Sequence, residues 1–298
     1  MIIMLYISKL IGILKYQKQK LFKEERYIAT VRNRNYLKSC IHDLLLPKEE
    51  VNQIVKFLSR YLIEMNNYPF IHKYLYRYIR VYVDKEVEMN YVLHNKKRLY
   101  FKRGMTKSQV RYAYNYLCIE QDKESPHSYN FEKINFVNEV VADIGAAEGI
   151  WGLNIIDKVK MLYLFECDER WVEALSQTFL PWKEKVFIVQ KYVSDKVYKN
   201  NISLDSFFYL KNIPLSIIKA DIEGSEIDML LGAKNMINAK WLKHLIVCTY
   251  HRNDDYENIC KILRENKYQI SSSKGFLAMY NYPDLSQVFR KGVVHGKY

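Results

Sequence analysis

The chain has 298 residues and a formal net charge of +13, which is enough length for one large domain or two medium ones. Its five cysteines form no CxxC pair and follow no zinc spacing, which excludes a zinc ribbon and favours reduced thiols in the cytoplasm. The apolar start, residues 1–14, is shorter than the ~20 residues of a spanning helix and lacks the features of a secretory signal. We therefore expect a cytoplasmic protein, with peripheral contact to the inner face of a membrane as an alternative.

The basic charge is concentrated in the first part of the chain. Residues 1–130 hold 24 Lys+Arg against 12 Asp+Glu, a net of +12, whereas residues 131–298 hold 22 against 21, a net of +1. Such an excess suits an anionic partner, such as a membrane surface, a phosphate-linked glycan, a nucleotide sugar or nucleic acid. A well-solvated lysine-rich surface explains it equally well.

Residues 1–83 are predicted to form a helical, basic N-terminal region. Apolar residues recur at helical spacing over 51–63, and Pro47 with two glutamates stands at the start of this stripe. The segment FIHKYLYRYIRVYV follows Pro69. It is rich in tyrosine, and so are the residues that follow it. The tyrosines interleaved with Lys and Arg are interpreted mainly as core residues, with stacking on sugars or bases as an alternative.

Residues 84–130 are predicted to be a short hairpin followed by a helix that leads into the next domain. The residues MNYVLHNKKRLYFKRG read as two strands around a turn at His94–Asn95. Thr106 is a candidate N-cap for a helix over TKSQVRYAYNYLCIEQD. A loop fixed by Pro126 follows.

Residues 131–298 alternate between strand and helix patterns. Strands are expected within 138–144, 161–168, 186–195, 216–224 and 244–251, and helices within 151–159, 170–180, 225–233 and 255–267. This alternation is typical of an α/β domain with a mainly parallel, Rossmann-like sheet covered by helices on both faces. Ligands of such sheets lie beyond the carboxyl ends of the strands, near the topological switch point.

The first strand of this domain ends in a candidate ligand loop, Asp143-Ile-Gly145-Ala-Ala-Glu-Gly149. Gly145 permits a tight turn and Gly149 permits close approach of a helix or ligand. The dinucleotide fingerprint GxGxxG fails, because Ala147 and Ile150 stand where glycines belong. The DxGxxxG pattern suits a nucleoside with an amino-acid tail, namely S-adenosylmethionine, although many strand–helix turns contain two glycines.

Two further acids stand where the next strands end. Glu166 follows Gly145 by 21 residues, and a carboxylate there can accept hydrogen bonds from both ribose hydroxyls. Its alternative role is to cap the following helix. Asp195, after the third strand, is a candidate acceptor for the adenine amino group, and a purely structural role is equally open for it.

Several motifs together resemble the FkbM family of S-adenosylmethionine-dependent methyltransferases. They are VVADIGAAEG, FECD, ISLDSF, IIKADIEGSEIDMLLGA and IVCTYH, and they span roughly residues 120–298. The resemblance implies a class I methyltransferase fold that modifies a hydroxyl of a sugar, glycan or similar metabolite, as in polysaccharide biosynthesis. It implies that the cofactor contacts the loop from Asp143 to Gly149, with Ala146 and Glu148 inside it, and Glu166. Residues 1–80 do not match the family core.

The stretch IIKADIEGSEIDML places three acids directly after the fourth strand, whose end would face the transferred methyl group. Asp221 is the best placed to contact the cofactor or an acceptor hydroxyl. Glu223 is a possible base, and Glu226 is interpreted as a charge that complements the helix dipole. His251, at the end of the fifth strand, is a third candidate base. His127 is expected either to contact the substrate or to stabilise a turn.

Other readings of these residues stay open at this point. Asp221, Glu223 and His251 together form an alternative site for a divalent metal, which we do not favour. Asp221-Ile-Glu223 also resembles the DxD motif of a glycosyltransferase. A basic protein that binds nucleic acid or membrane on a methyltransferase scaffold is a third alternative, although no nucleic-acid motif is present. The preferred partner is a small-molecule or glycan acceptor, with an anionic or phosphate-linked acceptor as one form of it.

Overall fold

The computed structural model describes residues 48–49, 52, 68–129, 131, 134–278 and 289–298. The chain divides into one unit of Met1–Pro69 with Ala278–Val288 and a second of Phe70–Leu277 with Phe289–Tyr298. The helix predicted over 51–63 and the apolar start lie almost wholly outside the described residues, so the proposed division at residue 83 stays a prediction. Among the described residues, no helix has the length and apolar character needed to cross a membrane.

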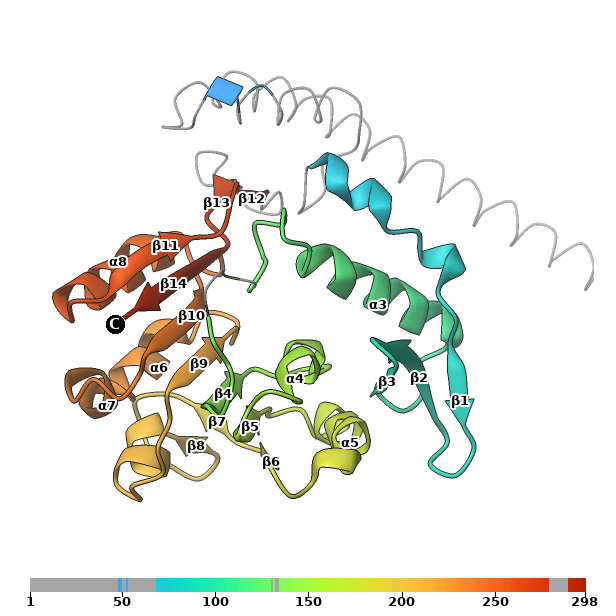
Figure 1. Ribbon diagram of the computed structural model, residues 1–298, viewed down its shortest axis with the longest axis horizontal. Coiled ribbons are helices and arrows are strands. Elements are labelled where there is room, and N and C mark those ends of the chain that lie inside the picture. Colours follow the sequence, from blue (N-terminus) through green and yellow to red (C-terminus); the bar gives the residue numbers. More distant parts are fainter. Residues whose placement is uncertain (1–47, 50–51, 53–67, 130, 132–133, 279–288) are drawn as a thin grey trace, which may run out of the picture. The chain divides into compact units, whose positions relative to one another are not determined.

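A seven-stranded sheet forms the centre of the second unit (Figure 1). Its spatial order is β11-β14-β10-β9-β4-β5-β6. Strand β14 is antiparallel to both of its neighbours, and the other pairs in the sheet are parallel. Its strands are β4 (Val140–Ile144), β5 (Met161–Phe165), β6 (Val186–Val189), β9 (Ile217–Ala220), β10 (His244–Cys248), β11 (Gln269–Ser272) and β14 (Val293–Lys297).

The order of the strands reverses between β4 and β9. The chain proceeds from β4 to β5 and β6 on one side, and then returns to β9 and β10 on the other. Asp143 of β4 pairs with Lys219 of β9, so the loops after Ile144 and Ala220 leave the sheet side by side. This reversal is the topological switch point where open α/β sheets bind ligands.

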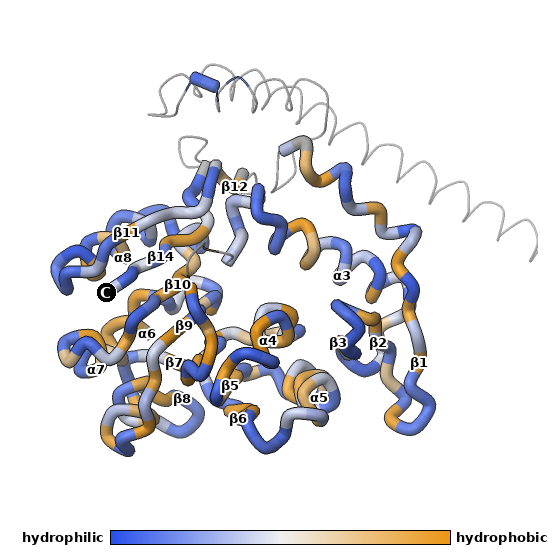
Figure 2. Tube along the Cα trace, in the orientation of Figure 1, coloured by the Kyte–Doolittle hydropathy of each residue, from blue (hydrophilic) through white to orange (hydrophobic). Residues whose placement is uncertain are grey.

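Helices cover both faces of the sheet, which confirms the predicted Rossmann-like fold class. Alternate strand residues face opposite sides. On one face, Ile218 and Val247 join a buried cluster with Met229 of α6 and Ile259 of α8. On the other face, Gly152 of α4 (Ile150–Ile155) lies against the side chains of strand β5. Figure 2 shows that hydrophobic residues run through the central strands and these helices, as burial in a core requires.

Two of the helices in the described residues begin at a residue whose side chain caps them. The α-helices are α3 (Lys107–Glu120), α4 (Ile150–Ile155), α5 (Glu169–Thr178), α6 (Glu226–Leu231), α7 (Lys234–Asn238) and α8 (Asp255–Glu265). Thr106 is the N-cap of α3, as predicted, and forms a capping box with Gln109. Asp168 caps α5 by accepting a hydrogen bond from the backbone of Arg170. Gly149, with a φ of 77°, is the N-cap residue of α4.

A second, three-stranded sheet precedes the central one in the chain. It consists of β1 (Tyr82–Asp84), β2 (Met89–His94) and β3 (Lys97–Tyr100). The turn between β2 and β3 is Asn95–Lys96, one residue later than predicted, because these two residues have φ values of 49° and 67°. Two consecutive positive φ values are typical of a tight turn that matches the twist of a hairpin.

The prediction of helix up to residue 83 is wrong at its end. The described part of this region forms two short 3-10 helices, η1 (Pro69–Lys73) and η2 (Tyr76–Tyr78), and then strand β1. Tyr82 pairs with Tyr91 of β2, and their rings stack with centroids 5.4 Å apart. Cross-strand pairing of this kind overrides the helical spacing of the tyrosines.

Short elements complete the unit. They are η3 (Leu180–Trp182), the paired strands β7 (Tyr192–Val193) and β8 (Asn201–Ile202), the π-helical turn η4 (Asp205–Tyr209), and the strands β12 (Leu277–Ala278) and β13 (Phe289–Arg290). Strands β7 and β8 matter for the site, because they extend the region beyond the carboxyl end of β6. The cysteines in the described residues, at 118, 167, 248 and 260, are free thiols, as expected.

Candidate functional site at the carboxyl ends of the strands

A pocket of about 600 Å³ lies at the switch point, and we call it the larger pocket. Its size falls in the range of small-molecule and cofactor sites. Its walls come from the ends of four central strands and from β7 and β8. The lining residues used below are Gly145, Ala147, Glu166, Cys167, Tyr192, Ser194, Asn201, Asp221, Glu223 and Ser225.

Gly145 makes the close contact between the two loops that leave the switch point. Its φ is +74°, and an added Cβ atom would lie 1.9 Å from the carbonyl oxygen of Asp221. Its N–H and that of Ala146 both donate to the carbonyl of Phe165. Only glycine meets both the positive φ and the close approach. At Gly149 an added Cβ atom would meet Leu175 of α5, so the predicted close approach is to a helix, and Gly149 does not line the larger pocket.

Glu166 stands at the wall of the larger pocket, with 8% of its surface exposed. One carboxylate oxygen accepts the N–H of Ala147 at 2.9 Å, and the other accepts those of Cys167 and Asp168 at 2.8 Å each. A carboxylate offers about four lone-pair directions, so three accepted bonds leave capacity for a further donor. The carboxylate therefore holds the loop after β4 against the loop after β5 while facing the pocket.

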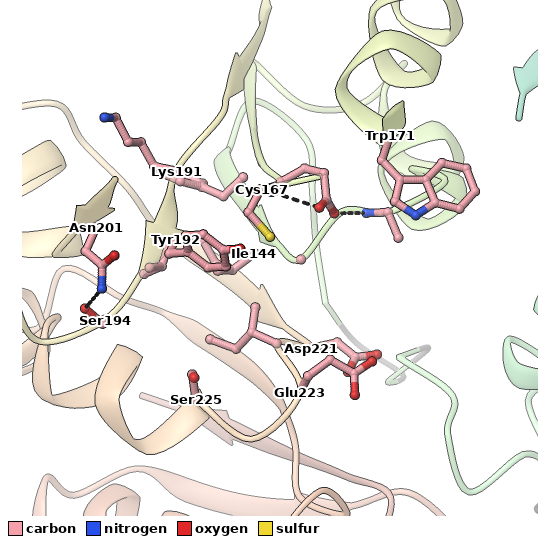
Figure 3. Close-up of a pocket in the computed structure, with 16 residues that line it drawn as sticks. Ile144, Cys167, Trp171, Lys191, Tyr192, Ser194, Asn201, Asp221, Glu223 and Ser225 are labelled. Atoms are coloured by element: carbon pink, nitrogen blue, oxygen red, sulfur yellow. Dashed lines mark hydrogen bonds between the residues drawn. The ribbon is translucent and has the colours of Figure 1, made fainter. Parts of the chain in front are cut away.

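The far end of the larger pocket is formed by β7 and β8. Figure 3 shows Tyr192 and Cys167 near each other, with Ser194 and Asn201 joined by a hydrogen bond of 3.3 Å. Asp195, predicted to accept from adenine, is exposed and is not among the lining residues. Its neighbour Ser194 lines the pocket instead, and the adenine role of Asp195 stays a prediction.

A second hollow of about 190 Å³, the smaller pocket, lies on the other side of the Gly145 loop. It shares Gly145, Ala147, Asp221 and Glu223 with the larger pocket, so the two hollows meet at the switch point. Ala146, Glu148 and His127, all predicted site residues, line it together with Glu120 of α3. Burial raises the pKa of Glu148 to about 7, and it also raises the pKa of Glu120.

A buried ion pair forms the floor of the smaller pocket. Lys219 Nζ lies 2.9 Å from Asp143 Oδ1 and donates to the carbonyl of Gly145 at 2.9 Å. Burial lowers the pKa of Lys219, but the negative charges of Asp143 and Asp221 outweigh it and raise the pKa above its ordinary value. Asp143 therefore contacts the loop through Lys219, a residue that we did not predict. A lysine inside the otherwise apolar strand IIKA was the available signal.

Asp221 lies at the junction of the two pockets, and two rings contact it on one side. Its Oδ2 accepts a short hydrogen bond from the Tyr129 hydroxyl and lies 3.5 Å from His127 Nε2. The same His127 nitrogen is 2.9 Å from the hydroxyl of Tyr250. Burial raises the pKa of Asp221, but the hydrogen bond from His127 and the charges of His127 and Lys219 outweigh it, so the pKa lies below its usual range.

The other oxygen of Asp221 faces His251. Asp221 Oδ1 lies 3.3 Å from His251 Nε2, and Glu223 Oε2 lies 3.6 Å from that nitrogen. The side chain of Glu223 is 92% exposed, whereas that of Asp221 is 18% exposed. The structure thus brings the three predicted catalytic residues together at one corner.

Glu226 differs from its interpretation as a charge at a helix start. It is the first residue of α6, as expected, but its side chain is fully buried. Its Oε1 lies 2.9 Å from His251 Nδ1 and accepts the N–H of Ile222 at 2.8 Å. Burial lowers the pKa of His251, but the bond to Glu226 and the charge of Asp221 outweigh it and raise the pKa. Glu226 therefore fixes the ring of His251 in this corner.

Comparison with known proteins finds no matching family model and no match among curated proteins. Among solved structures, the chain is similar to methyltransferase FkbM from Methylobacillus flagellatus, with 21% identity and a TM-score of 0.46. That match covers 63% of this chain and 54% of the other, so the chain spans about half the length of that protein.

Two other solved structures are also similar. Precorrin-6y C5,15-methyltransferase from Geobacter metallireducens has 9% identity and a TM-score of 0.37, over 61% of this chain and 87% of the other. A Streptococcus pneumoniae protein in complex with S-adenosyl-L-methionine has 14% identity and a TM-score of 0.37, over 54% and 67%. Similarities at this level do not assign an activity to this chain.

Proposed function

We propose that this chain is an S-adenosylmethionine-dependent methyltransferase of the FkbM type, which methylates a hydroxyl of a sugar, glycan or similar metabolite. The observation that carries the proposal is the arrangement at the switch point. The Gly145 loop and the Glu166 carboxylate face one pocket of about 600 Å³, and Asp221 stands where this pocket meets the second hollow. The FkbM-like motifs VVADIGAAEG, FECD and IIKADIEGSEIDMLLGA fall on these same loops.

The residues present fit the cofactor. Glu166 retains lone-pair capacity toward the pocket for ribose hydroxyls, after accepting three backbone N–H groups. The smaller pocket offers both a buried cation, Lys219, and carboxylates, as a zwitterionic amino-acid tail requires. S-adenosylmethionine supplies a methyl group on a sulfonium, which is transferred by in-line displacement. In this proposal the chain contributes by positioning and by drawing the proton from the acceptor.

The acceptor side of the site is assigned to Asp221, Glu223 and His251. These groups can accept the hydroxyl proton as the oxygen attacks, and such acid–base assistance typically contributes about 10²–10⁴-fold in rate. Glu226 holds the Nδ1 nitrogen of His251, and the Nε2 nitrogen lies toward Asp221. An oxygen acceptor suits this set, because a hydroxyl has a proton that must be removed.

Isothermal titration with S-adenosylhomocysteine tests the cofactor assignment. Glu166→Gln should weaken binding about 10–100-fold, the effect of losing a hydrogen bond to a charged group. The control is Glu169→Gln, an exposed acid three residues along the chain, which should stay within about twofold of the native value. Absent binding by the native chain, or equal loss in both variants, would refute the assignment. Binding of a nucleotide sugar instead would favour the glycosyltransferase alternative.

A further inference from the structure

Four carboxylates surround His251 in the corner beyond β9 and β10, where Arg252 also acts on Asp255. Asp221, Glu223, Glu226 and Asp255 all act electrostatically on His251 or on one another. Glu226 and Asp255 are buried, at 0% and 1% exposure. Burying carboxylates in this way is costly unless a cation or hydrogen bonds compensate.

Two buried oxygens in the corner support this reading. Glu226 Oε2 and Asp255 Oδ1 are each inaccessible to solvent and accept no hydrogen bond from the described residues. The other oxygen of each carboxylate is used, since Glu226 Oε1 accepts from Ile222 and Asp255 Oδ2 accepts from Arg252. Buried acceptors are rarely left without a partner, so the unused oxygen of Glu226 is available for a further donor or a cation.

We infer that Asp221, Glu226 and His251 form a binding site for one divalent transition-metal ion. Each can offer one ligand atom, and these atoms all lie within 4.8 Å of one another, as ligands of a common ion do. Two carboxylates and one imidazole suit Mn²⁺ or Zn²⁺ better than Ca²⁺, which prefers oxygen ligands alone. The ligand set differs from the metal alternative in the sequence, because the buried Glu226 replaces the exposed Glu223.

A second group in the described residues, His127, Asp221 and Cys248, is less suited to an ion. The Tyr129 hydroxyl already occupies the Asp221 oxygen on that side. Burial raises the pKa of the Cys248 thiol well above its ordinary value, which opposes the thiolate that a metal needs. The Oδ1 side of Asp221, toward His251, is therefore the better site.

The chemical role of the ion rests on the proposed function, whereas the binding does not. An ion at this corner would coordinate the acceptor hydroxyl and lower its pKa. The acceptor oxygen then forms the new bond to the methyl carbon while the carbon–sulfur bond breaks and its electron pair stays on sulfur. With Asp221 and His251 acting as ligands, Glu223 is left to take the hydroxyl proton and pass it to water, because it is exposed.

Titration of the full chain with Mn²⁺, followed by electron paramagnetic resonance of the free ion, tests the site. The native chain should bind one ion, and Glu226→Gln should weaken binding at least about 10-fold. This substitution keeps an oxygen for the Ile222 N–H and nearly the same shape. His251→Gln provides a second, independent variant if Glu226→Gln fails to fold, which circular dichroism reports.

The matched control is Asp228→Asn, which removes an acid from the same helix, α6, outside the ligand group. It should change Mn²⁺ affinity by less than about twofold. No binding below about 1 mM, or equal affinity in the control and both ligand variants, would overturn the inference. Titration of the same samples with S-adenosylhomocysteine separates the two proposals, because a chain that binds the nucleoside but no Mn²⁺ refutes only the ion site.

Discussion

Substitution of Gly145 by alanine tests whether the loops after β4 and β9 can approach each other closely only because residue 145 has no side chain. Two costs combine at this residue. A non-glycine residue at a φ of +74° costs roughly 1–2 kcal/mol. The new Cβ atom would lie 1.9 Å from the Asp221 carbonyl oxygen, and relieving such a backbone clash typically costs about 1–3 kcal/mol more. We therefore expect a loss of about 2–5 kcal/mol in the free energy of unfolding.

Two other glycines separate these costs. Gly104 has a φ of +83° with open space around an added Cβ atom, so Gly104→Ala should show only the conformational cost, about 1–2 kcal/mol. Gly232 has no positive φ, but its Cβ atom would lie 2.2 Å from the Ser194 carbonyl oxygen, so Gly232→Ala should show only the clash. Urea denaturation followed by circular dichroism measures all three. If Gly145→Ala is no more destabilising than Gly104→Ala, the close contact between Gly145 and the backbone of Asp221 is refuted.

Three further predictions concern titratable side chains. Lys219→Met should destabilise the fold by about 3–5 kcal/mol, because Asp143 is left buried without its cation. The double variant with Asp143→Asn should recover part of this loss. Urea denaturation measures both variants. Glu223→Ala should change the free energy of unfolding by less than about 0.5 kcal/mol, because its side chain is 92% exposed; a larger effect would contradict its solvent-facing placement. Burial and the charge of His244 lower the pKa of His295 to about 4, so the folded state resists protonation. Its contribution to stability is complete above pH ~6.5 and is lost as the pH falls toward 4. Unfolding at pH 7 and pH 5 should differ by about 1–2 kcal/mol more in the native chain than in His295→Gln, and equal differences would refute this.

Much of the fold was predictable because local patterns agree with it. The alternation of apolar strands and amphipathic helices after residue 137 corresponds to β4 through α8, and Thr106 caps its helix as its residue type indicates. The failure at Tyr82–Asp84 has a local cause as well. Helical spacing of tyrosines does not exclude a strand. Whether the segment pairs as a strand depends on its partner β2, which lies further along the chain.

The chain's sequence alone determined the loop at Gly145, the acid at Glu166 and the acids after β9, because each follows directly from one strand–turn–helix segment. Only the tertiary structure decided how these residues combine. The order β4-β9-β10 places His251 beside Asp221, and burial turns Glu226 from a helix-start charge into a partner of His251. Lys219 likewise acquires its role only because β9 pairs with β4. Contacts between strand ends depend on sheet order and on which side chains lose solvent, and neither is encoded within any single segment.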